Sequence, residues 1–300
     1  MAPKDLLLAL VVIVAWGLNF VVIKVGLDGL PPLLLGALRF ALVAFPAVLF
    51  IKRPKLPWRW LLAYGLTISL GQFAFLFEAM AHGMPPGLAS LVLQSQAFFT
   101  LFFAAFFLKE QLRPASVLGL LVAAGGLALI GLEGEHATPL LAVLLTLCGA
   151  AMWAMGNIIT RRFGNVNLVA LVIWGALVPP LPFLALSWWL EGEARIVDSL
   201  LNIQLSSVLS LAYLALIATM LGYSLWGTLL SRYPAGKVAP FSLLVPVIGL
   251  SSSAWLLGER LGTLQWIGGG LVMVGLIVNV FGARLWSLVR RPAAPASGMR

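Results

Sequence analysis

Residues 85–112 read PPGLASLVLQSQAFFTLFFAAFFLKEQL, and this stretch decides how the rest of the chain is interpreted. Its section from Pro86 to Leu108 runs for 23 residues without a formal charge. A helix of that length is about 34 Å long, enough to cross a hydrocarbon core of about 30 Å. Its middle holds Gln94, Ser95 and Gln96, side chains that lipid disfavours and a water-filled cavity accepts. The stretch therefore predicts a membrane-spanning helix that borders a polar cavity.

The same stretch occurs a second time, as PAGKVAPFSLLVPVIGLSSSAWLLGERL over residues 234–261. An offset of 149 also pairs Tyr64 with Tyr213, and an offset near 137 pairs Trp16 with Trp153, followed by an asparagine in each copy. Chance similarity between apolar segments would be carried by Leu, Val and Ala, whereas here it is carried by Trp, Tyr, Asn, Pro, Gly and Glu. We therefore interpret the chain as an internal repeat. The stretch and its copy share Pro85, Gly87, Ala105, Leu108, Glu110 and Leu112.

Composition places the repeat in a membrane. The chain is 61% hydrophobic and 10% charged, with a mean hydropathy of +1.04, whereas about a quarter of the residues in soluble domains are charged. A net charge of +9 could suggest a nucleic-acid partner, but the basic residues lie in short loops between apolar runs and form no patch. The single cysteine, Cys148, excludes a disulfide framework or a thiol metal cluster within one chain.

Ten apolar runs predict ten membrane spans, and the fold class is an all-α integral membrane protein. Each half has five spans, residues 1–133 and 134–284, and a cytoplasmic tail expected to be disordered follows at 285–300. Because five is odd, the second half enters the bilayer from the opposite side, which gives two inverted five-helix repeats. The expected spans are 5–26, 33–51, 59–81, 86–108, 115–132, 138–160, 167–190, 206–231, 236–257 and 263–283.

Charged loops predict the orientation. Fifteen of the 19 Lys and Arg residues fall at one set of span ends, and only Arg195 and Arg260 lie in the opposite loops. Most acidic residues between spans lie on the side that is poor in Lys and Arg. Since basic loops stay in the cytoplasm, both termini are expected there, in a multi-pass protein of the inner membrane.

The doubled unit resembles the EamA-type transporters of the drug/metabolite transporter superfamily. The resemblance lies in WGLNF near the start and in LKEQL and GERL after the fourth and ninth spans. Over nearly the whole chain the sequence is similar to the bacterial O-acetylserine/cysteine exporters, through stretches such as WGLNFVVIKVG, GLASLVLQSQAFFT and VAPFSLLVPVIGL. The resemblance implies a central cavity between the halves and export of small amino-acid metabolites. Export of other amino acids, such as aromatic ones, or of hydrophobic drugs remains the alternative.

Polar side chains near the span centres are the candidate substrate-binding residues. An amino acid is a zwitterion, so neutral amides, hydroxyls and aromatic rings could hold both of its ends. Each residue could equally make an interhelical hydrogen bond, worth about 0.6 kcal/mol. Gln94 and Gln96 lie about 200° apart on an α-helix, so both are not expected to face one cavity equally. The candidates are Trp16, Asn19, Gln72, Gln94, Trp153, Asn157 and Tyr223.

Prolines and glycines suggest where helices bend and pack. Pro246 lies midway along the ninth span, where a proline removes a backbone hydrogen bond, and it is the predicted hinge. The fifth and tenth spans are almost purely aliphatic and glycine. This composition suits packing against a neighbouring helix or against a second subunit in a homodimer.

Three charges lie within spans and invite two explanations. Arg39 and Glu78 have glycines at the matching positions of the second half, so the packing of the repeat does not explain them. One explanation is an Arg39–Glu78 ion pair that locks the outer ends of two helices. The other is that Glu78 exchanges a proton as the cavity opens outward, with Arg39 or Lys24 favouring its charged form, so that proton entry drives export.

Other function classes fit the sequence less well. An enzyme would need a catalytic constellation, and the chain has only His82 and His136, no HExxH spacing and no paired carboxylates in a usable context. A receptor or channel gives no reason for an inverted repeat, whereas alternating access does. No cofactor or metal is expected, and the expected partners are a small-molecule substrate, protons and membrane lipid.

Overall fold

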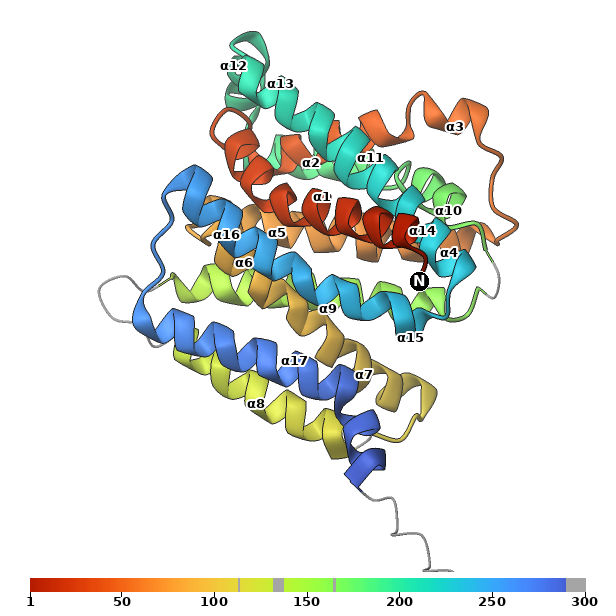
Figure 1. Ribbon diagram of the computed structural model, residues 1–300. Helices are drawn as coiled ribbons and strands as arrows, with labels where there is room; N and C mark the ends of the chain where they lie inside the picture. Colours follow the sequence, from red (N-terminus) through yellow and green to blue (C-terminus); the bar gives the residue numbers. More distant parts are fainter. Residues whose placement is uncertain (113, 132–137, 164–165, 290–300) are drawn as a thin grey trace, which may run out of the picture.

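The computed structural model describes residues 1–112, 114–131, 138–163 and 166–289, and over these residues the chain is helical (Figure 1). The first half contains α1 (Pro3–Leu27), α2 (Pro32–Ala44), α3 (Ala47–Phe50), α4 (Trp58–Tyr64), the π-helix η1 (Gly65–Gly71), α5 (Gln72–Ala81), α6 (Pro86–Val92), the 3-10 helix η2 (Leu93–Ser95), α7 (Gln96–Leu108) and α8 (Pro114–Gly131).

The second half repeats this pattern, with a surface helix inserted. It contains α9 (Leu140–Thr160), α10 (Leu168–Gly175), α11 (Pro180–Leu190), α12 (Glu193–Leu201), α13 (Leu205–Ala212), the π-helix η3 (Tyr213–Leu221), α14 (Gly222–Arg232), α15 (Ala235–Val238), the 3-10 helix η4 (Ala239–Leu244), α16 (Val245–Leu257) and α17 (Thr263–Val289).

The predicted spans correspond to these helices. Within the described residues, nine helices are long and apolar enough to cross a membrane, and α8 is a shorter apolar helix at the position of the fifth span. The chain is thus a multi-pass membrane protein built as two inverted repeats. Helix α17 continues to Val289, five residues into the tail expected to be disordered, and residues 290–300 and the boundary at 133/134 lie outside the described residues.

Local breaks within the spans recur in both halves. The π-helix η1 in the third span corresponds to η3 in the eighth, and the 3-10 helix η2 in the fourth corresponds to η4 in the ninth. Helices α7 and α16 both end at a left-handed residue, Lys109 with φ 55° and Gly258 with φ 66°, which the repeat offset relates to each other. Because Lys carries a Cβ, the left-handed backbone strains Lys109 and not Gly258.

The pairing of α8 with α17 reveals the two-fold relation between the halves. The two helices lie side by side over most of their length (Figure 1). A Cβ added at Gly119 would lie 2.5 Å from the Gly275 carbonyl oxygen, and one added at Gly126 would lie 2.4 Å from that of Gly268. The repeat relates Gly119 to Gly268 and Gly126 to Gly275, so each close contact is the symmetry mate of the other. The glycine faces predicted to pack against a helix or a second subunit therefore pack against each other within the chain.

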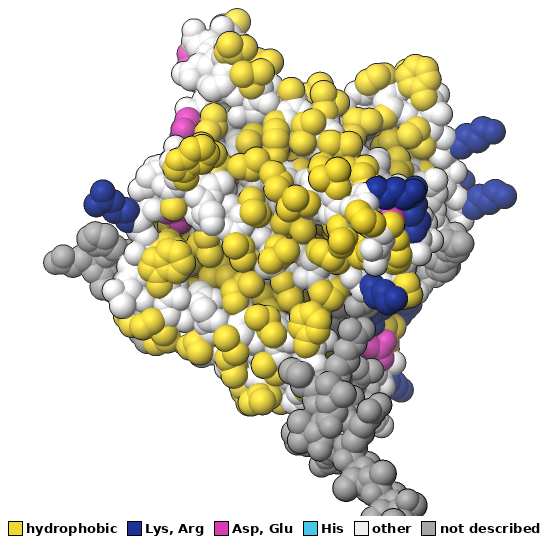
Figure 2. All heavy atoms as spheres, in the orientation of Figure 1, with side chains coloured by type: hydrophobic (Ala, Val, Ile, Leu, Met, Phe, Trp, Pro, Cys, Tyr) yellow, Lys and Arg dark blue, Asp and Glu magenta, His cyan; other side chains and the backbone are white. Residues whose placement is uncertain are grey.

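The two sides of the molecule differ in charge. The basic side, where α1 begins, carries the loop with Lys52, Arg53 and Lys55, and the acidic side, where α1 ends, carries Glu193 and Glu259. Hydrophobic side chains cover the face between them, with Lys and Arg gathered mainly at the edge near the N-terminus (Figure 2). This distribution is the one expected of a protein whose middle is surrounded by lipid.

Carboxylates join helices at both sides. On the basic side, Asp5 accepts hydrogen bonds from Arg232 Nη1 at 2.6 Å and from the Tyr233 hydroxyl at 2.8 Å, which ties the start of α1 to the end of α14. On the acidic side, Glu191 accepts the backbone N–H groups of Leu33, at 2.7 Å, and Leu34, at 3.2 Å, at the start of α2. A carboxylate at a helix N-terminus satisfies backbone donors that have no partner within the helix.

Candidate functional site: a cavity between the two halves

A cavity of about 500 Å³ lies between the two repeats and is lined by helices from both. Small-molecule sites typically enclose about 300–1,000 Å³, so this volume suits a small metabolite. All seven residues predicted as substrate-binding line this cavity, and so does Arg39. Lys24, Glu78 and Pro246 are absent from its lining. The seven are Trp16, Asn19, Gln72, Gln94, Trp153, Asn157 and Tyr223.

One wall of the cavity is aromatic and is positioned by a π-helix. The Trp16 indole Nε1 donates to the Ala218 carbonyl, within η3, at 2.9 Å. The Trp16 ring lies 5.3 Å from the ring of Tyr223 and 5.2 Å from that of Trp226, centroid to centroid. Gly222 makes this approach possible, because a Cβ there would lie 2.6 Å from the indole nitrogen.

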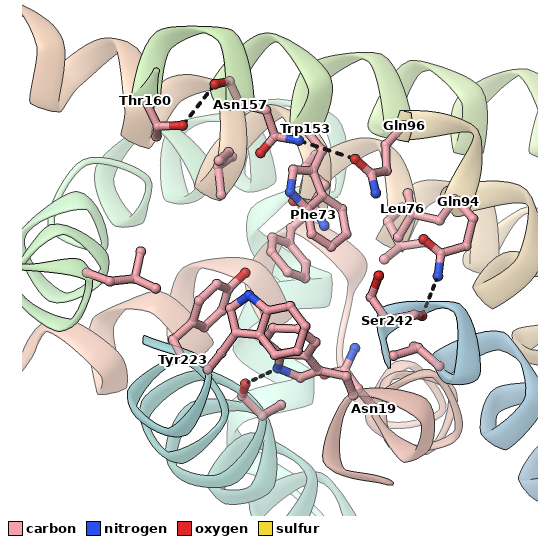
Figure 3. Close-up of a pocket in the computed structure, with 18 of the residues that line it drawn as sticks. Asn19, Phe73, Leu76, Gln94, Gln96, Trp153, Asn157, Thr160, Tyr223 and Ser242 are labelled. Carbon is pink, nitrogen blue, oxygen red and sulfur yellow. Dashed lines mark hydrogen bonds between the residues drawn. The ribbon is translucent and has the colours of Figure 1, made fainter. Parts of the chain in front are cut away.

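The opposite wall carries amides from the fourth and sixth spans (Figure 3). Asn157 Nδ2 donates to Gln96 Oε1 at 3.2 Å and to Thr100 Oγ1 at 3.3 Å, and Gln94 Nε2 donates to the Ser242 carbonyl at 3.0 Å. The last bond connects the fourth span to the ninth. Gln94 and Gln96 thus already have hydrogen-bond partners, so their side chains are ordered before any substrate binds.

Gln94 and Gln96 both line the cavity, although an α-helix would not turn them equally toward it. The reason is the 3-10 helix η2, which ends between them at Ser95. Each 3-10 residue advances about 120° around the axis, where an α-helical residue advances about 100°. Ideal 3-10 geometry would place two such side chains about 120° apart by the shorter way, where an α-helix would place them about 160° apart.

Arg39 occupies the interior and does not pair with Glu78. Its side chain is 2% exposed, its Nη2 donates to Thr219 Oγ1 at 3.0 Å, and its guanidinium carbon lies 4.1 Å from the centroid of the Phe73 ring. Glu78 lies against His82, one turn further along its own helix, at 3.5 Å. The proposed lock between Arg39 and Glu78 is therefore wrong in this structure, since each charge has found a nearer partner.

Lys24 likewise pairs locally. Its Nζ lies 3.2 Å from Asp28 Oδ1 at the acidic end of α1, and both side chains are exposed. An exposed pair one helical turn apart contributes only about 0.3–0.5 kcal/mol. The three charges within the spans therefore lie in three separate environments.

The cavity reaches the basic side and is closed on the acidic side. Toward the basic side its lining includes Phe163 and Val166 from the loop after α9. Toward the acidic side, α6 and α16 close it, because a Cβ at Gly249 would lie 2.4 Å from Ser90 Oγ. Beyond this contact, Glu259 Oε2 accepts the Gly87 backbone N–H, at the start of α6, at 2.9 Å.

Glu259 receives a second donor from its own span, since the Ser253 hydroxyl also donates to Oε2. Its repeat mate Glu110 is in a different state on the basic side. That carboxylate accepts two hydrogen bonds from Arg161 Nη1, at 2.9 and 3.1 Å, and is exposed. The same residue in the two copies thus has two different partners.

Pro246 lies at a break in its helix and not within a continuous one. It is the second residue of α16, which directly follows the 3-10 helix η4. The matching break at η2 in the fourth span lacks a proline at this position, where Ala97 stands. The 3-10 break therefore does not require Pro246, and a hinge role for that residue stays a prediction.

Comparison with known proteins agrees with this architecture. The model of the EamA-like transporter family matches residues 4–132 and again residues 140–281. The chain belongs to the EamA-like transporter family. It is 52% identical over 291 residues to a probable amino-acid metabolite efflux pump of Escherichia coli (strain K12), covering 95% of this chain and 97% of that protein.

Two further comparisons concern the sequence and the fold of this EamA-like transporter. A probable amino-acid metabolite efflux pump of Salmonella typhimurium (strain LT2) is 53% identical over 300 residues, covering 98% of this chain and 99% of that protein. A solved crystal structure matches with a TM-score of 0.64 and 21% identity, covering 95% of this chain and 100% of that one. At that identity, the crystal structure supports the fold alone.

Several residues of the transporter's cavity were not among the sequence candidates. Phe73 and Trp226 were missed because, unlike Trp16 and Trp153, neither has an identical residue at the repeat offset to separate it from ordinary packing. Thr219 lies beneath the cavity, where its hydroxyl donates to the Leu214 carbonyl at 2.8 Å and accepts from Arg39. Its position depends on the π-helix, which sequence patterns did not reveal.

Proposed function

We propose that this EamA-like transporter exports small amino-acid metabolites from the cytoplasm across the inner membrane by alternating access. The names of the two relatives with 52% and 53% identity support this cargo class. The observation that carries the proposal is the cavity between two inverted repeats, which reaches one side of the molecule and is closed at the other. Substrate sites of such transporters lie at the interface of the repeats, near the middle of the bilayer.

The direction follows from the charge distribution. Basic loops favour the cytoplasm, so the basic side and both termini are assigned there. The cavity then opens toward the cytoplasm, which is the state in which an exporter takes up its cargo. The same cavity would release cargo after α6 and α16 separate on the acidic side.

The proposed substrate-binding residues are the seven that line the cavity. Neutral amides and aromatic rings dominate its interior, and Arg39 is its one cationic side chain among the described lining residues. Aromatic faces and amides suit a small polar molecule with an aliphatic or thiol side chain. Rings of Trp16 and Tyr223 would contact that side chain, and the amides of Asn19 and Asn157 would contact polar groups.

Counter-flow in proteoliposomes tests the cargo. Purified protein is reconstituted and preloaded with one unlabelled compound, and uptake of labelled small amino acids, aromatic amino acids and a hydrophobic drug is compared. We expect small amino acids to exchange fastest. Preferred exchange of aromatic amino acids or of the drug would overturn the proposed cargo class.

The same assay tests the site. Asn19→Ala and Asn157→Ala should each weaken exchange at low substrate concentration while the protein keeps its melting temperature. Asn202→Ala, at an exposed asparagine after the surface helix α12, is the matched control and should leave exchange unchanged. Normal exchange in both cavity variants would move the binding site elsewhere.

We propose in addition that proton entry through Glu78 drives export. Glu78 lies near the acidic end of its span, and the ionisable groups around it are His82, Glu191 and Arg195. In Glu78→Gln, pH-driven uptake into inverted vesicles should be lost while counter-flow without a gradient is retained. Glu193→Gln, at an exposed acid on the same side, is the control. Normal pH-driven uptake in Glu78→Gln would overturn the proton role.

A further inference from the structure

Arg39 presents an incompletely satisfied cation inside the membrane-spanning part of the fold. Among the described residues, its Nε and Nη1 atoms have no hydrogen-bond partner, and only Nη2 is bound, to Thr219. No carboxylate in the described part of the chain forms an ion pair with it. Charged side chains within membrane spans are costly, and they mark substrate pathways where the protein itself supplies no counter-ion.

The surroundings of Arg39 hold its guanidinium in one orientation. The guanidinium carbon lies 4.1 Å from the Phe73 ring centroid and 5.5 Å from that of Phe40. Thr219 fixes one end of the group, and it is itself tied to the π-helix η3. A guanidinium held in this way presents its remaining N–H groups as a rigid planar fork, which matches the two oxygens of a carboxylate.

The same cavity offers acceptors of the opposite kind. Asn19 Oδ1 and Gln72 Oε1 are buried and, within the described residues, accept no hydrogen bond. Both side chains line the cavity together with Arg39. Amide oxygens are suitable acceptors for an ammonium group, which is a donor only. The polar groups without partners are thus the guanidinium N–H donors of Arg39 on α2 and the amide oxygens of Asn19 on α1 and Gln72 on α5.

We propose that Arg39 binds the α-carboxylate of the transported molecule and that Asn19 and Gln72 accept hydrogen bonds from its α-ammonium group. This assignment rests on the proposed function and narrows its substrate class to molecules that carry both groups free. It replaces the expectation that neutral groups alone hold the zwitterion. Compounds in which either group is removed or blocked leave buried polar atoms unpaired and are rejected.

Phe73 provides the step by which the carboxylate reaches Arg39. The ring lies against the guanidinium of Arg39. Figure 3 shows the same ring among the residues that line the cavity. Because Arg39 Nε and Nη1 are buried, the ring must shift before a carboxylate in the cavity can reach them. Until then the aromatic face stabilises the cation through its π-electrons.

Ligand discrimination by the wild-type protein is the first test. Purified protein in detergent is titrated with L-cysteine, L-cysteine methyl ester, cysteamine and 3-mercaptopropionate, and binding is followed by tryptophan fluorescence, since Trp16 and Trp153 line the cavity. The three analogues lack, in turn, the carboxylate charge, the carboxylate and the ammonium group. We expect L-cysteine to bind at least about 30-fold more tightly than each analogue. Equal binding of L-cysteine and its methyl ester would overturn the role of Arg39.

Variants make the assignment specific to the residue. Arg39→Gln should lose the preference for L-cysteine over its methyl ester, and Arg39→Lys, which keeps the charge without the fork, should retain part of it. Arg53→Met is the matched control, because Arg53 also lies over an aromatic ring, 4.7 Å from that of Trp58, but is exposed outside the cavity. An unchanged preference in Arg39→Gln would overturn the proposal.

The failure of this inference differs from the failure of the proposed function. If no amino acid exchanges in counter-flow, the cargo class itself is wrong. If amino acids exchange but methyl esters and amines exchange equally well, the transporter function stands and the zwitterion assignment falls. For the ammonium arm, Gln72→Leu should bring the binding of 3-mercaptopropionate closer to that of L-cysteine, and an unchanged ratio would remove Gln72 from the site.

Discussion

Glu259→Gln should shift the transporter toward the state that opens on the acidic side. Glu259 belongs to the second half, and Gly87, whose N–H it accepts, starts α6 of the first half. Opening the cavity on the acidic side requires these two segments to separate, because Ser90 and Gly249 close it there. The Glu259 contact therefore stabilises only the state seen in the structure.

The magnitude follows from the two donors on this carboxylate, Gly87 N–H and the Ser253 hydroxyl. A hydrogen bond to a charged group contributes about 1.5–3 kcal/mol, and one between neutral groups about 0.5–1.5 kcal/mol. Glutamine keeps an acceptor oxygen, so the hydrogen bond from Gly87 is weakened by about 1–2 kcal/mol and not abolished. Loss of the negative charge beside the N-terminus of α6 removes about 0.3–1 kcal/mol more. A total of about 2 kcal/mol corresponds to roughly a 30-fold change in the population ratio of the two states.

Access to the closed end of the cavity provides the assay. Leu76 lines that end, so Leu76→Cys in a Cys148→Ala background is labelled by a membrane-impermeant maleimide added outside intact cells. Adding Glu259→Gln should raise the labelling rate by about 30-fold while the open state stays minor. Glu110→Gln is the matched control and should not raise the rate, since its exposed pair with Arg161 contributes only about 0–1 kcal/mol to the state seen in the structure. An unchanged rate in folded Glu259→Gln protein would refute the reasoning.

Three other predictions concern orientation and stability. Cysteines placed beside Glu193 should be labelled from outside intact cells, and those beside Lys55 should not; the reverse pattern would contradict the assigned direction of transport. Lys109→Gly should raise the unfolding free energy by about 1 kcal/mol, because it removes a Cβ from a residue in the left-handed conformation. A lower melting temperature of the variant would argue against backbone strain at Lys109. Gly126→Val should destabilise the fold by about 1–3 kcal/mol or more, because its side chain would meet the backbone of α17. Gly125→Val should be tolerated, because a Cβ there meets nothing within 4 Å. Equal melting temperatures of the two variants would contradict the close helix pairing.

The spans could be predicted from the sequence because the physical signals that define them are local. Prolines near the first turn begin α1, α2 and α6, and charges interrupt the apolar runs at their ends. The inverted repeat could also be predicted, since chemically distinctive residues such as Trp16 and Trp153 recur at a fixed offset. Polar residues in the middle of apolar helices then located the cavity, because lipid leaves them few other places to face.

What the sequence did not reveal depends on contacts between distant segments. The nearest acid on a neighbouring span made Glu78 the expected partner of Arg39, whereas the structure brings Thr219 to it from the other half. The 3-10 turn at residues 93–95 contains Leu, Gln and Ser, none of which breaks a helix, so the pairing of Gln94 and Gln96 in one cavity was not foreseeable. The π-helices carry no residue signature of their own and were missed for the same reason.

The glycine contacts between α8 and α17 follow the two-fold relation between the halves, and this bears on the proposed transport cycle. If the two halves exchange conformations when the cavity changes sides, the Gly119–Gly275 contact takes the place of Gly126–Gly268, and the reverse also holds. The pair therefore has the same energy before and after the exchange, and two identical halves would populate both states equally. Any bias must come from positions where the copies differ, such as Ser253, which donates to Glu259, against Ala104, which has no hydroxyl to offer Glu110. The resting orientation of the transporter is therefore set by the positions at which its two repeats differ.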